Sequence, residues 1–442
     1  MKIERELLNE LKRWKDNRYR KPLVLQGARQ VGKSFILKQF GAQYFENYCY
    51  VNFDFEREHK MEFSLTKDPA RIVSYLTAVK GMDIKPEKTL IIFDEIQECN
   101  DALNSLKYFR ELMPEQAVVC AGSLLGVALK RDGASFSVGN IDFLTLFPVS
   151  FKEFLVLYNK KLSLFLENYV SSSILTKIPE IFHTQIIEAY KVYLCCGGMP
   201  ETIVRYLKNR DWNEVDVINN RILTAYTLDF AKHIDSKDIP RLQRLWQNIQ
   251  DNLVKEDRKF KYSLIERNAR GRDYENSVEW LVLSGLVNRV FEISTLRLPL
   301  SSCKNSNAFK LYLADSGLLR TKFRLTPTTI LQGDRLFTEF KGILTENYVL
   351  QSFVRQFEND IFYWNSGNLA EVEFVFQYTE MIIPVEAKSA LSTKSKSLSE
   401  YRKKYQPALS LRFSLKNVEK NDDLLNLPLY LTDYTKNLII PN

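Results

Sequence analysis

A glycine-framed loop between an apolar strand and a helix is the feature that most limits what this chain can fold into. Residues 27–34 read GARQVGKS and match the pattern G-x-x-x-x-G-K-[ST], directly after the apolar run 22–26 and before the helix-compatible residues 35–40. The glycines let backbone N–H groups surround phosphate oxygens, and the helix N-terminus adds the positive end of its dipole. A strand, loop and helix in this order predict an α/β domain built on a parallel sheet.

The loop predicts a site for a nucleoside triphosphate, so ATP and Mg²⁺ are the cofactors that we expect. Lys33 is expected to reach the β and γ phosphates, and the Ser34 hydroxyl to ligate Mg²⁺. A glycine-rich turn that matches the pattern by accident is the alternative, and the flanking strand and helix argue against it. The residues expected to line the nucleotide are Gly27, Ala28, Arg29, Gln30, Val31, Gly32, Lys33, Ser34 and Phe35.

A second buried strand ends in two acids. Leu90 to Phe93 are apolar and lead into Asp94 and Glu95, which places both carboxylates at the carboxyl edge of the sheet, where ligands of such sheets bind. Asp94 is expected to hold the magnesium with its water shell, and Glu95 to polarise the attacking water. The reaction would then be hydrolysis, with a plain surface acid as the alternative for Glu95.

The next strand ends at Gly122, which places the Ser123 hydroxyl near the same edge. Ser123 is predicted to act in catalysis as a sensor of the γ phosphate, and a cap of the following helix is the alternative. Arg110 and Arg131 are candidates for a charge-stabilising arginine. A place on a solvated face is the alternative that we favour for each, and such an arginine can also come from a neighbouring subunit.

Hydrophobic periodicity divides the 442 residues into several parts, as their number alone suggests. The first part alternates five β-rich runs with helix-like stretches, and the second is helical around the breaker Gly197-Gly198-Met199-Pro200. The third has the element order of a winged helix, and the fourth returns to a helix followed by strands. We therefore predict an α/β domain at 1–160, a helical lid at 161–239, a winged-helix-like domain at 240–325 and a second α/β domain at 326–442.

Cysteine and histidine usage argues against a zinc site or a disulfide framework. The six cysteines are scattered without a C-x-x-C pair, and the three histidines are far apart. The chain is charged from its first residues, and its longest uncharged stretch, 117–129, is too short to span a bilayer. We expect a cytoplasmic protein without a membrane partner.

Carboxylates near the carboxyl end form a second candidate site. Glu386 and Lys388 lie two apart on a predicted strand, so both side chains point to one face. Glu373 on the preceding strand and Glu346 on the preceding helix complete a pattern that resembles the PD-(D/E)xK nuclease core, in which carboxylates bind Mg²⁺ and the lysine orients water. The alternatives are a nuclease-like fold kept for binding, or an ordinary alternating strand with solvated ends.

Basic residues gather in two stretches, although the net charge of the chain is only +8. One stretch spans residues 255–272 in the predicted winged helix, and the other spans 388–420, with nine basic residues against two acids. Aromatic residues interleave both, which suits contact with a phosphate backbone. Two basic faces that only keep the protein soluble are the alternative.

On these motifs the chain resembles prokaryotic AAA-type, STAND-like P-loop ATPases with a carboxy-terminal domain of unknown function that has a restriction-endonuclease-like core. The resemblance implies a P-loop NTPase sheet followed by a lid, a winged helix and a restriction-endonuclease-like α/β domain. It also implies that Pro200, within Gly198-Met199-Pro200, contacts the nucleotide base. Asn140 departs from the family, whose members often carry a basic residue there. The motifs are Gly27 to Ser34, 93–97, Gly122-Ser123, 147–154, 197–201, 315–319 and 386–389.

Two functions follow from these expectations. The first is an Mg²⁺-dependent ATPase whose nucleotide cycle moves the lid and reorients the winged-helix and nuclease-like domains on DNA. The second is a regulatory switch that binds nucleotide and a protein partner and cuts nothing. An arginine supplied by another subunit would require the chain to assemble as a homo-oligomer.

Overall fold

The computed structural model describes residues 3–122, 138–172, 174–234, 238–267, 269–332, 338–357, 361–367, 370–389 and 396–439. The chain forms two compact units. The N-terminal unit contains residues 2–147 and 283–286, and the C-terminal unit contains residues 148–282 and 287–442. Each unit is described by itself below.

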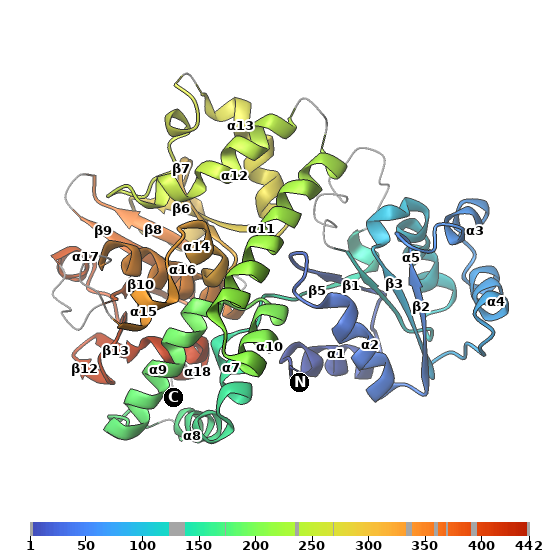
Figure 1. The fold of residues 1–442 in the computed structure, drawn as a ribbon, viewed down its shortest axis with the longest axis horizontal. Coiled ribbons are helices and arrows are strands. Elements are labelled where there is room, and N and C mark those ends of the chain that lie inside the picture. Colours follow the sequence, from blue (N-terminus) through green and yellow to red (C-terminus); the bar gives the residue numbers. More distant parts are fainter. Residues whose placement is uncertain are drawn as a thin grey trace. The chain divides into compact units, whose positions relative to one another are not determined.

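The N-terminal unit is built on a five-stranded parallel sheet in the order β2-β3-β4-β1-β5 (Figure 1). Each strand overlaps one of the five predicted β-rich runs, at 22–26, 48–54, 90–94, 117–122 and 141–147, so the predicted parallel sheet is confirmed. All six residues of β3 are buried, as a strand covered on both faces requires. The strands are β1 (Leu23–Gln26), β2 (Asn47–Asn52), β3 (Thr89–Asp94), β4 (Val118–Ala121) and β5 (Asp142–Thr145).

Among the described residues, five helices accompany these strands, and their ends follow from local sequence. One example is α4, where the Asp68 side chain accepts the N–H of Ala70, Pro69 opens the first turn and Gly81 closes the helix in the left-handed conformation. A core of strand and helix side chains, including Val51, Phe93 and Leu106, packs on one face of the sheet. The helices are α1 (Leu7–Asp16), α2 (Lys33–Tyr44), α3 (His59–Leu65), α4 (Pro69–Lys80) and α5 (Asn100–Leu112).

Helices begin the C-terminal unit, in agreement with the helical stretch predicted from residue 161. The first of them starts with a capping box, in which Ser150 and Glu153 satisfy each other's backbone N–H groups. A short helix η3 (Tyr262–Leu264) lies between the last two of the series. These helices are α7 (Phe151–Tyr158), α8 (Lys160–Ser171), α9 (Glu180–Cys196), α10 (Pro200–Asn209), α11 (Trp212–His233), α12 (Ile239–Leu253) and α13 (Gly271–Leu283).

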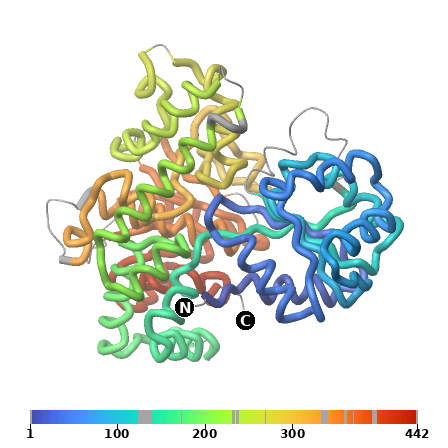
Figure 2. Tube along the Cα trace, turned by 45° about the vertical axis from the view of Figure 1, so that its right-hand side comes forward, coloured from blue at the N-terminus to red at the C-terminus, as the bar shows by residue number. Residues whose placement is uncertain are grey.

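An eight-stranded mixed sheet forms the centre of the C-terminal unit, in the order β12-β13-β11-β10-β9-β8-β6-β7. The hairpin of β6 and β7 belongs to the predicted winged-helix region, yet β6 pairs in parallel with β8 of the following region. In Figure 2 the yellow trace of the first region accordingly runs beside the orange trace of the second. The two regions therefore share one sheet, and the four-part division of the chain stays a prediction. The strands are β6 (Val287–Ile293), β7 (Lys304–Leu313), β8 (Ile361–Asn365), β9 (Glu371–Tyr378), β10 (Met381–Ala387), β11 (Ser410–Ser414), β12 (Glu419–Asn421) and β13 (Leu424–Pro428).

Aromatic packing fills both faces of this sheet. On one face, Trp364 contacts Tyr401 of α17 within a buried cluster. On α16, Phe353 packs against Phe374 of β9 and Phe413 of β11. The remaining helices of the unit are α14 (Ser316–Lys322), α15 (Pro327–Gln332), α16 (Thr338–Gln356), α17 (Lys396–Tyr405) and α18 (Thr435–Leu438).

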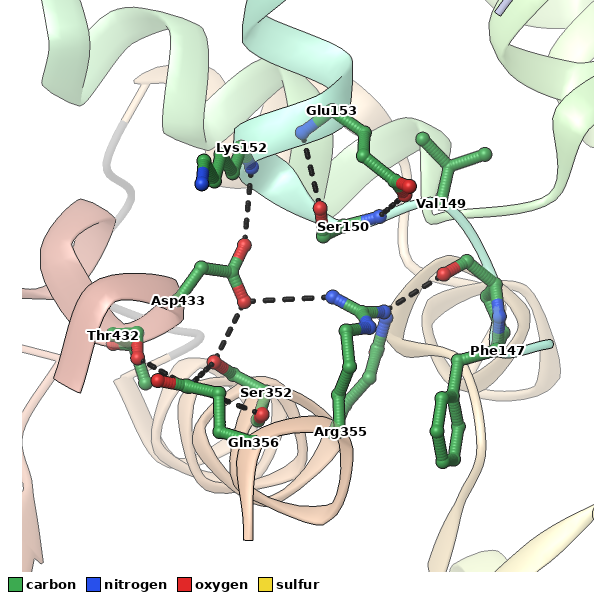
Figure 3. A network of polar contacts seen from close by, with 12 residues as sticks. Phe147, Val149, Ser150, Lys152, Glu153, Ser352, Arg355, Gln356, Thr432 and Asp433 are labelled. Carbon is green, nitrogen blue, oxygen red and sulfur yellow. Dashed lines mark hydrogen bonds and ion pairs between the residues drawn. The ribbon is translucent and has the colours of Figure 1, made fainter. Parts of the chain in front are cut away.

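Figure 3 shows how one carboxylate ties α7 to the carboxyl end of the unit. Asp433 accepts the backbone N–H of Lys152 at 3.1 Å and the Ser352 hydroxyl at 2.6 Å, and it pairs with Arg355 at 3.5 Å. Arg355 also donates to the backbone oxygen of Pro148 at 2.7 Å. The motif at 147–154 therefore has a structural role, because its first residues are held by α16 and by the segment before α18.

The two glycines at 197 and 198 pack against the start of α14. The Asp315 carboxylate caps α14 through the N–H of Leu318 at 2.9 Å and also accepts the N–H of Gly198 at 2.5 Å. Gly197 has φ 75°, and a Cβ there would lie 2.3 Å from an Asp315 oxygen. Two motifs far apart in the sequence thus form one tightly packed joint, in which only glycine fits.

Candidate functional site

The phosphate loop connects β1 to α2 and takes a shape that depends on its glycines. Gly27 has φ 142°, and a Cβ on it would lie 2.2 Å from the backbone oxygen of Leu146. Gly32 has φ 96° and immediately precedes α2, which begins at Lys33. Gln30 also has a positive φ of 68°. The loop thus leads directly into the N-terminus of α2. The first N–H groups of a helix have no helical partners and can bind an anion.

Lys33 is held close to the loop's own backbone. Its side chain is buried, with 7% of the residue exposed, and its Nζ donates to the backbone oxygens of Gly27 at 2.8 Å and Ala28 at 2.9 Å. Burial lowers the pKa of this ammonium to about 8, while the carboxylates of Glu95 and Asp94 act in the opposite direction. The structure therefore brings the predicted lysine and both predicted acids into one electrostatic environment.

Asp94 is the last residue of β3 and is 2% exposed. Its Oδ2 accepts the Tyr50 hydroxyl at 2.6 Å and its Oδ1 accepts the Glu95 N–H at 3.1 Å. Tyr50, on the neighbouring strand β2, was missed in the sequence analysis. The alternation of Tyr48, Tyr50 and Asn52 was the available signal, because period two sends these three side chains to one face of the strand.

Glu95 follows β3 in the left-handed conformation, with φ 50°. Its Oε2 accepts the Gln97 amide at 2.6 Å, so Gln97 holds the carboxylate in place. Burial raises the pKa of Glu95, and the neighbouring Asp94 adds to this, while the Gln97 hydrogen bond, Lys33 and Arg29 oppose it. A carboxylate with a raised pKa is a stronger base than an ordinary glutamate, which suits proton removal from water.

The other predicted nucleotide residues lie where the loop and its helix place them. Ser34 is half-buried in the first turn of α2, and Phe35 beside it is 56% exposed. Arg110 lies in the last turn of α5. Ser123 and Arg131 lie outside the described residues, and Asn140 is in the short helix η2 (Val138–Asn140).

Pro200 occupies the first turn of α10. Its neighbour Gly198 is held by Asp315 and also accepts the N–H of Val149 at 2.7 Å through its backbone oxygen. These contacts explain the motif structurally within the C-terminal unit. A contact between Pro200 and a nucleotide base stays a prediction.

The chemistry of the N-terminal site fits Mg²⁺. Ser34 offers a hydroxyl and Asp94 a carboxylate, both oxygen ligands of the kind that Mg²⁺ prefers. Among the residues that the structure describes, no group of three or more His, Cys, Asp or Glu is placed to hold a metal ion. A magnesium that accompanies a nucleotide needs only one or two protein groups, because phosphate oxygens and water fill its remaining positions.

The four predicted nuclease-like residues come from α16, β9 and the end of β10. Lys388 Nζ lies 3.2 Å from an oxygen of Glu386 and 3.5 Å from an oxygen of Glu373. Glu386 and Lys388 therefore share a face of the sheet, as their spacing predicts. Burial raises the pKa of Glu373, with Lys388 opposing it.

Basic side chains occupy this cluster where a cation would bind. Glu346 forms an ion pair with Arg258 and accepts the Tyr312 hydroxyl at 3.2 Å. Glu386 accepts Arg412 Nε at 2.7 Å in addition to its contact with Lys388. Both arginines had been counted in the basic stretches, but their pairing with distant acids could not be read from the sequence. Because their carboxylates are already paired, these residues do not fit a metal site in this arrangement.

Comparison with known families assigns the first part of the chain. Residues 19–155 match the family described as an AAA domain, and so form an AAA-type P-loop domain. Residues 187–329 match a domain of unknown function (DUF8612), and residues 341–430 match another (DUF4143). The restriction-endonuclease-like core and the winged helix stay predictions. A search of curated proteins found no match.

Solved structures give only distant likenesses. The Walker-type ATPase PABY2304 of Pyrococcus abyssi is 14% identical, covers 73% of this chain and 96% of its own, and has a TM-score of 0.43. The ORC2 protein of Aeropyrum pernix is 14% identical with coverages of 75% and 95% and a TM-score of 0.36. RuvB of Thermotoga maritima is 13% identical with coverages of 65% and 90% and a TM-score of 0.32. These values do not establish a shared fold for the whole chain.

Proposed function

We propose that the N-terminal unit binds ATP with Mg²⁺ and hydrolyses it. One observation carries the proposal: the buried Lys33 ammonium lies against the loop backbone within the electrostatic reach of Asp94 and Glu95. This is the set of groups that phosphoryl transfer to water requires, namely a cation for the phosphates, an acid for the metal and a base for the water. The match of residues 19–155 to an AAA domain supports it.

Each residue then has one task. The loop N–H groups and Lys33 bind the phosphate oxygens, and Ser34 and Asp94 hold the magnesium, which neutralises charge on the β and γ phosphates when bound. Glu95, held by Gln97, orients a water molecule and accepts its proton. The buried apolar strand β3 fixes both acids at one edge of the sheet.

Two variants separate binding from chemistry. In Lys33→Ala we expect ATP affinity, measured by calorimetry, to fall below detection. In Glu95→Gln we expect binding to remain and phosphate release to fall by about 100-fold or more, the usual contribution of a general base. Lys12→Ala, on the exposed face of α1, is the matched control and should behave as wild type. Unchanged hydrolysis in Lys33→Ala would refute the proposal.

We propose further that the C-terminal unit contacts DNA. Exposed basic side chains support this, among them Lys255, Arg267 and Arg270 between α12 and α13. Other members of the two basic stretches are paired with acids, as Lys259 is with Glu292, so the exposed residues are the ones to test. Replacing these three by alanine should weaken binding to duplex DNA, measured by fluorescence anisotropy, and flatten its salt dependence by about one unit of slope per lost phosphate contact. An unchanged affinity and slope would count against DNA contact at this face.

The second candidate is a nucleotide-dependent switch that binds a protein partner and has a catalytically inactive nuclease-like domain. The ion pairs of Arg258 with Glu346 and of Arg412 with Glu386 favour it, because they neutralise the carboxylates that a metal would need. Incubating the protein with DNA and Mn²⁺ tests the point. We expect no cleavage by the wild type or by Glu386→Ala, whereas cleavage that is lost in Glu386→Ala would reject this candidate.

A further inference from the structure

Tyr50 gives the Asp94 carboxylate a partner from a neighbouring strand. Strands β2 and β3 pair in parallel with Asn52 opposite Asp94, so Tyr50 lies two residues before the pairing partner of the acid. From there its hydroxyl reaches Asp94 Oδ2 at 2.6 Å. The Glu95 N–H holds the other oxygen at 3.1 Å, so each carboxylate oxygen accepts one hydrogen bond from the part of the chain that the structure describes.

The direction of the Tyr50 hydrogen bond follows from its second partner. The Asn52 amide nitrogen donates to the Tyr50 oxygen at 3.3 Å. A tyrosine hydroxyl has one proton, and an amide NH₂ group has only donors, so the hydroxyl proton is directed to Asp94. The bond is therefore assisted by the charge of the carboxylate, which makes it one of the stronger hydrogen bonds of the site.

The ring of Tyr50 is held as well as its hydroxyl. Lys38 Nζ lies 3.6 Å from the centre of the ring, in cation–π contact, one turn of α2 beyond Ser34. Asn52 is fixed in turn, because its N–H donates to Glu56 at 2.9 Å and its side-chain oxygen accepts the N–H of Asp54 at 3.0 Å. Tyr50 is thus a rigid support and has little freedom to follow Asp94 if the carboxylate turned.

We propose that Tyr50 is a positioning residue that orients Asp94 toward the magnesium of the bound nucleotide. This inference rests on the proposed ATPase function. A carboxylate offers about two acceptor positions on each oxygen, so the bonds from Tyr50 and from the Glu95 N–H leave one on each oxygen for the metal or its water. Without the hydroxyl, Asp94 would sample other rotations about its terminal bond, whose preference is broad.

Tyr50→Phe tests the inference, since it removes the hydroxyl and keeps the ring that Lys38 contacts. The affinity of the full chain for ATP is measured by calorimetry in EDTA and over a Mg²⁺ series. We expect the affinity in EDTA to stay within about twofold of wild type and the half-saturating Mg²⁺ concentration to rise about tenfold, the effect of one hydrogen bond to a charged group. Hydrolysis at saturating Mg²⁺ should recover most of the wild-type rate.

Tyr48→Phe is the matched control, because it makes the same chemical change two residues earlier on the same strand and should leave the Mg²⁺ response unchanged. An unaltered Mg²⁺ response in Tyr50→Phe would overturn the inference while leaving the ATPase proposal standing. Equal weakening with and without Mg²⁺ would also overturn it, because it would indicate a structural role only. Wild-type protein that binds no ATP would reject the ATPase proposal, and the inference with it.

Discussion

Lys310 and Glu371 form an ion pair whose two members are buried to very different degrees. Lys310 on β7 is 0% exposed and Glu371 on β9 is 25% exposed. The Tyr363 ring lies 4.5 Å from the ammonium and adds a cation–π contact. Breaking the pair from either side removes the same interaction, yet the charge left behind differs. We therefore predict unequal effects for Glu371→Gln and Lys310→Met.

Glu371→Gln leaves an ammonium with no access to water. Removing one partner of a buried pair lowers the free energy of unfolding by about 3–5 kcal/mol, and we expect a loss of this size for Glu371→Gln. Lys310→Met leaves a carboxylate that water still reaches and replaces the ammonium by an apolar group of similar length. We expect a cost of about 0–2 kcal/mol, and a double variant close to wild type, since replacing both members of a buried pair is often nearly neutral.

The assay is equilibrium unfolding in urea followed by tryptophan fluorescence, which reports mainly on the C-terminal unit because four of the five tryptophans lie there. Burial lowers the pKa of Lys310 and Glu371 opposes this, so the pKa should fall further in Glu371→Gln. The folded state then releases the proton at lower pH than the unfolded state, so stability rises with pH up to the ordinary lysine pKa. The cost of Glu371→Gln relative to wild type should therefore shrink as the pH rises toward the pKa of Lys310 in the wild type, which burial already holds below the ordinary lysine value. A larger cost for Lys310→Met, or a cost of Glu371→Gln that does not change with pH, would refute the reasoning.

Four further substitutions test the packing and hydrogen-bonding arguments. Gly27→Ala should lower ATP affinity in calorimetry by about 100-fold, because its Cβ would meet a backbone oxygen at 2.2 Å and displace the loop. Gly197→Ala should destabilise the C-terminal unit by about 3 kcal/mol in urea unfolding, whereas Gly367→Ala in the same unit, whose Cβ meets nothing within 4 Å, should cost only about 1 kcal/mol. Asp433→Ala removes the partner of Lys152 N–H, Ser352 and Arg355 at once and should lower the urea midpoint of the same unit by an amount corresponding to about 3 kcal/mol.

The N-terminal unit was largely predictable because its signals are local. The loop pattern, the apolar strand before Asp94 and the alternation of strands with helices each act within a few residues, and together they fixed the parallel sheet and the place of Lys33. The contact of Tyr50 with Asp94 was not predicted, because it depends on which strand lies beside β3. Strand order is a long-range property, and the sequence of one strand carries little information about its neighbour.

The C-terminal unit was less predictable for the same reason. The spacing of Glu386 and Lys388 correctly indicated a shared face, since period two is a local rule. The partners of these acids come from far away, Arg258 from the segment after α12 and Arg412 from β11. Both had been assigned to basic surface stretches. Counting basic residues along the sequence therefore overestimates the number of basic side chains that are free to bind a partner. The count does not show which acids the fold places next to each arginine.

The pairing of β6 with β8 restricts how a nucleotide cycle could act on the C-terminal unit. If the hairpin of β6 and β7 turned against the C-terminal strands, it would break the parallel ladder at 291–293 and the buried pair of Lys310 with Glu371. A ladder and a buried ion pair together make that motion costly, so the hairpin of β6 and β7 and the strands after it should move as one body. A cycle in which these two regions reorient independently of each other is therefore disfavoured. If the DNA proposal holds, hydrolysis must instead move the DNA-contacting surface as a whole. The chain passes from one unit to the other at 147–148, 282–283 and 286–287, and these are the covalent connections through which such a motion would act.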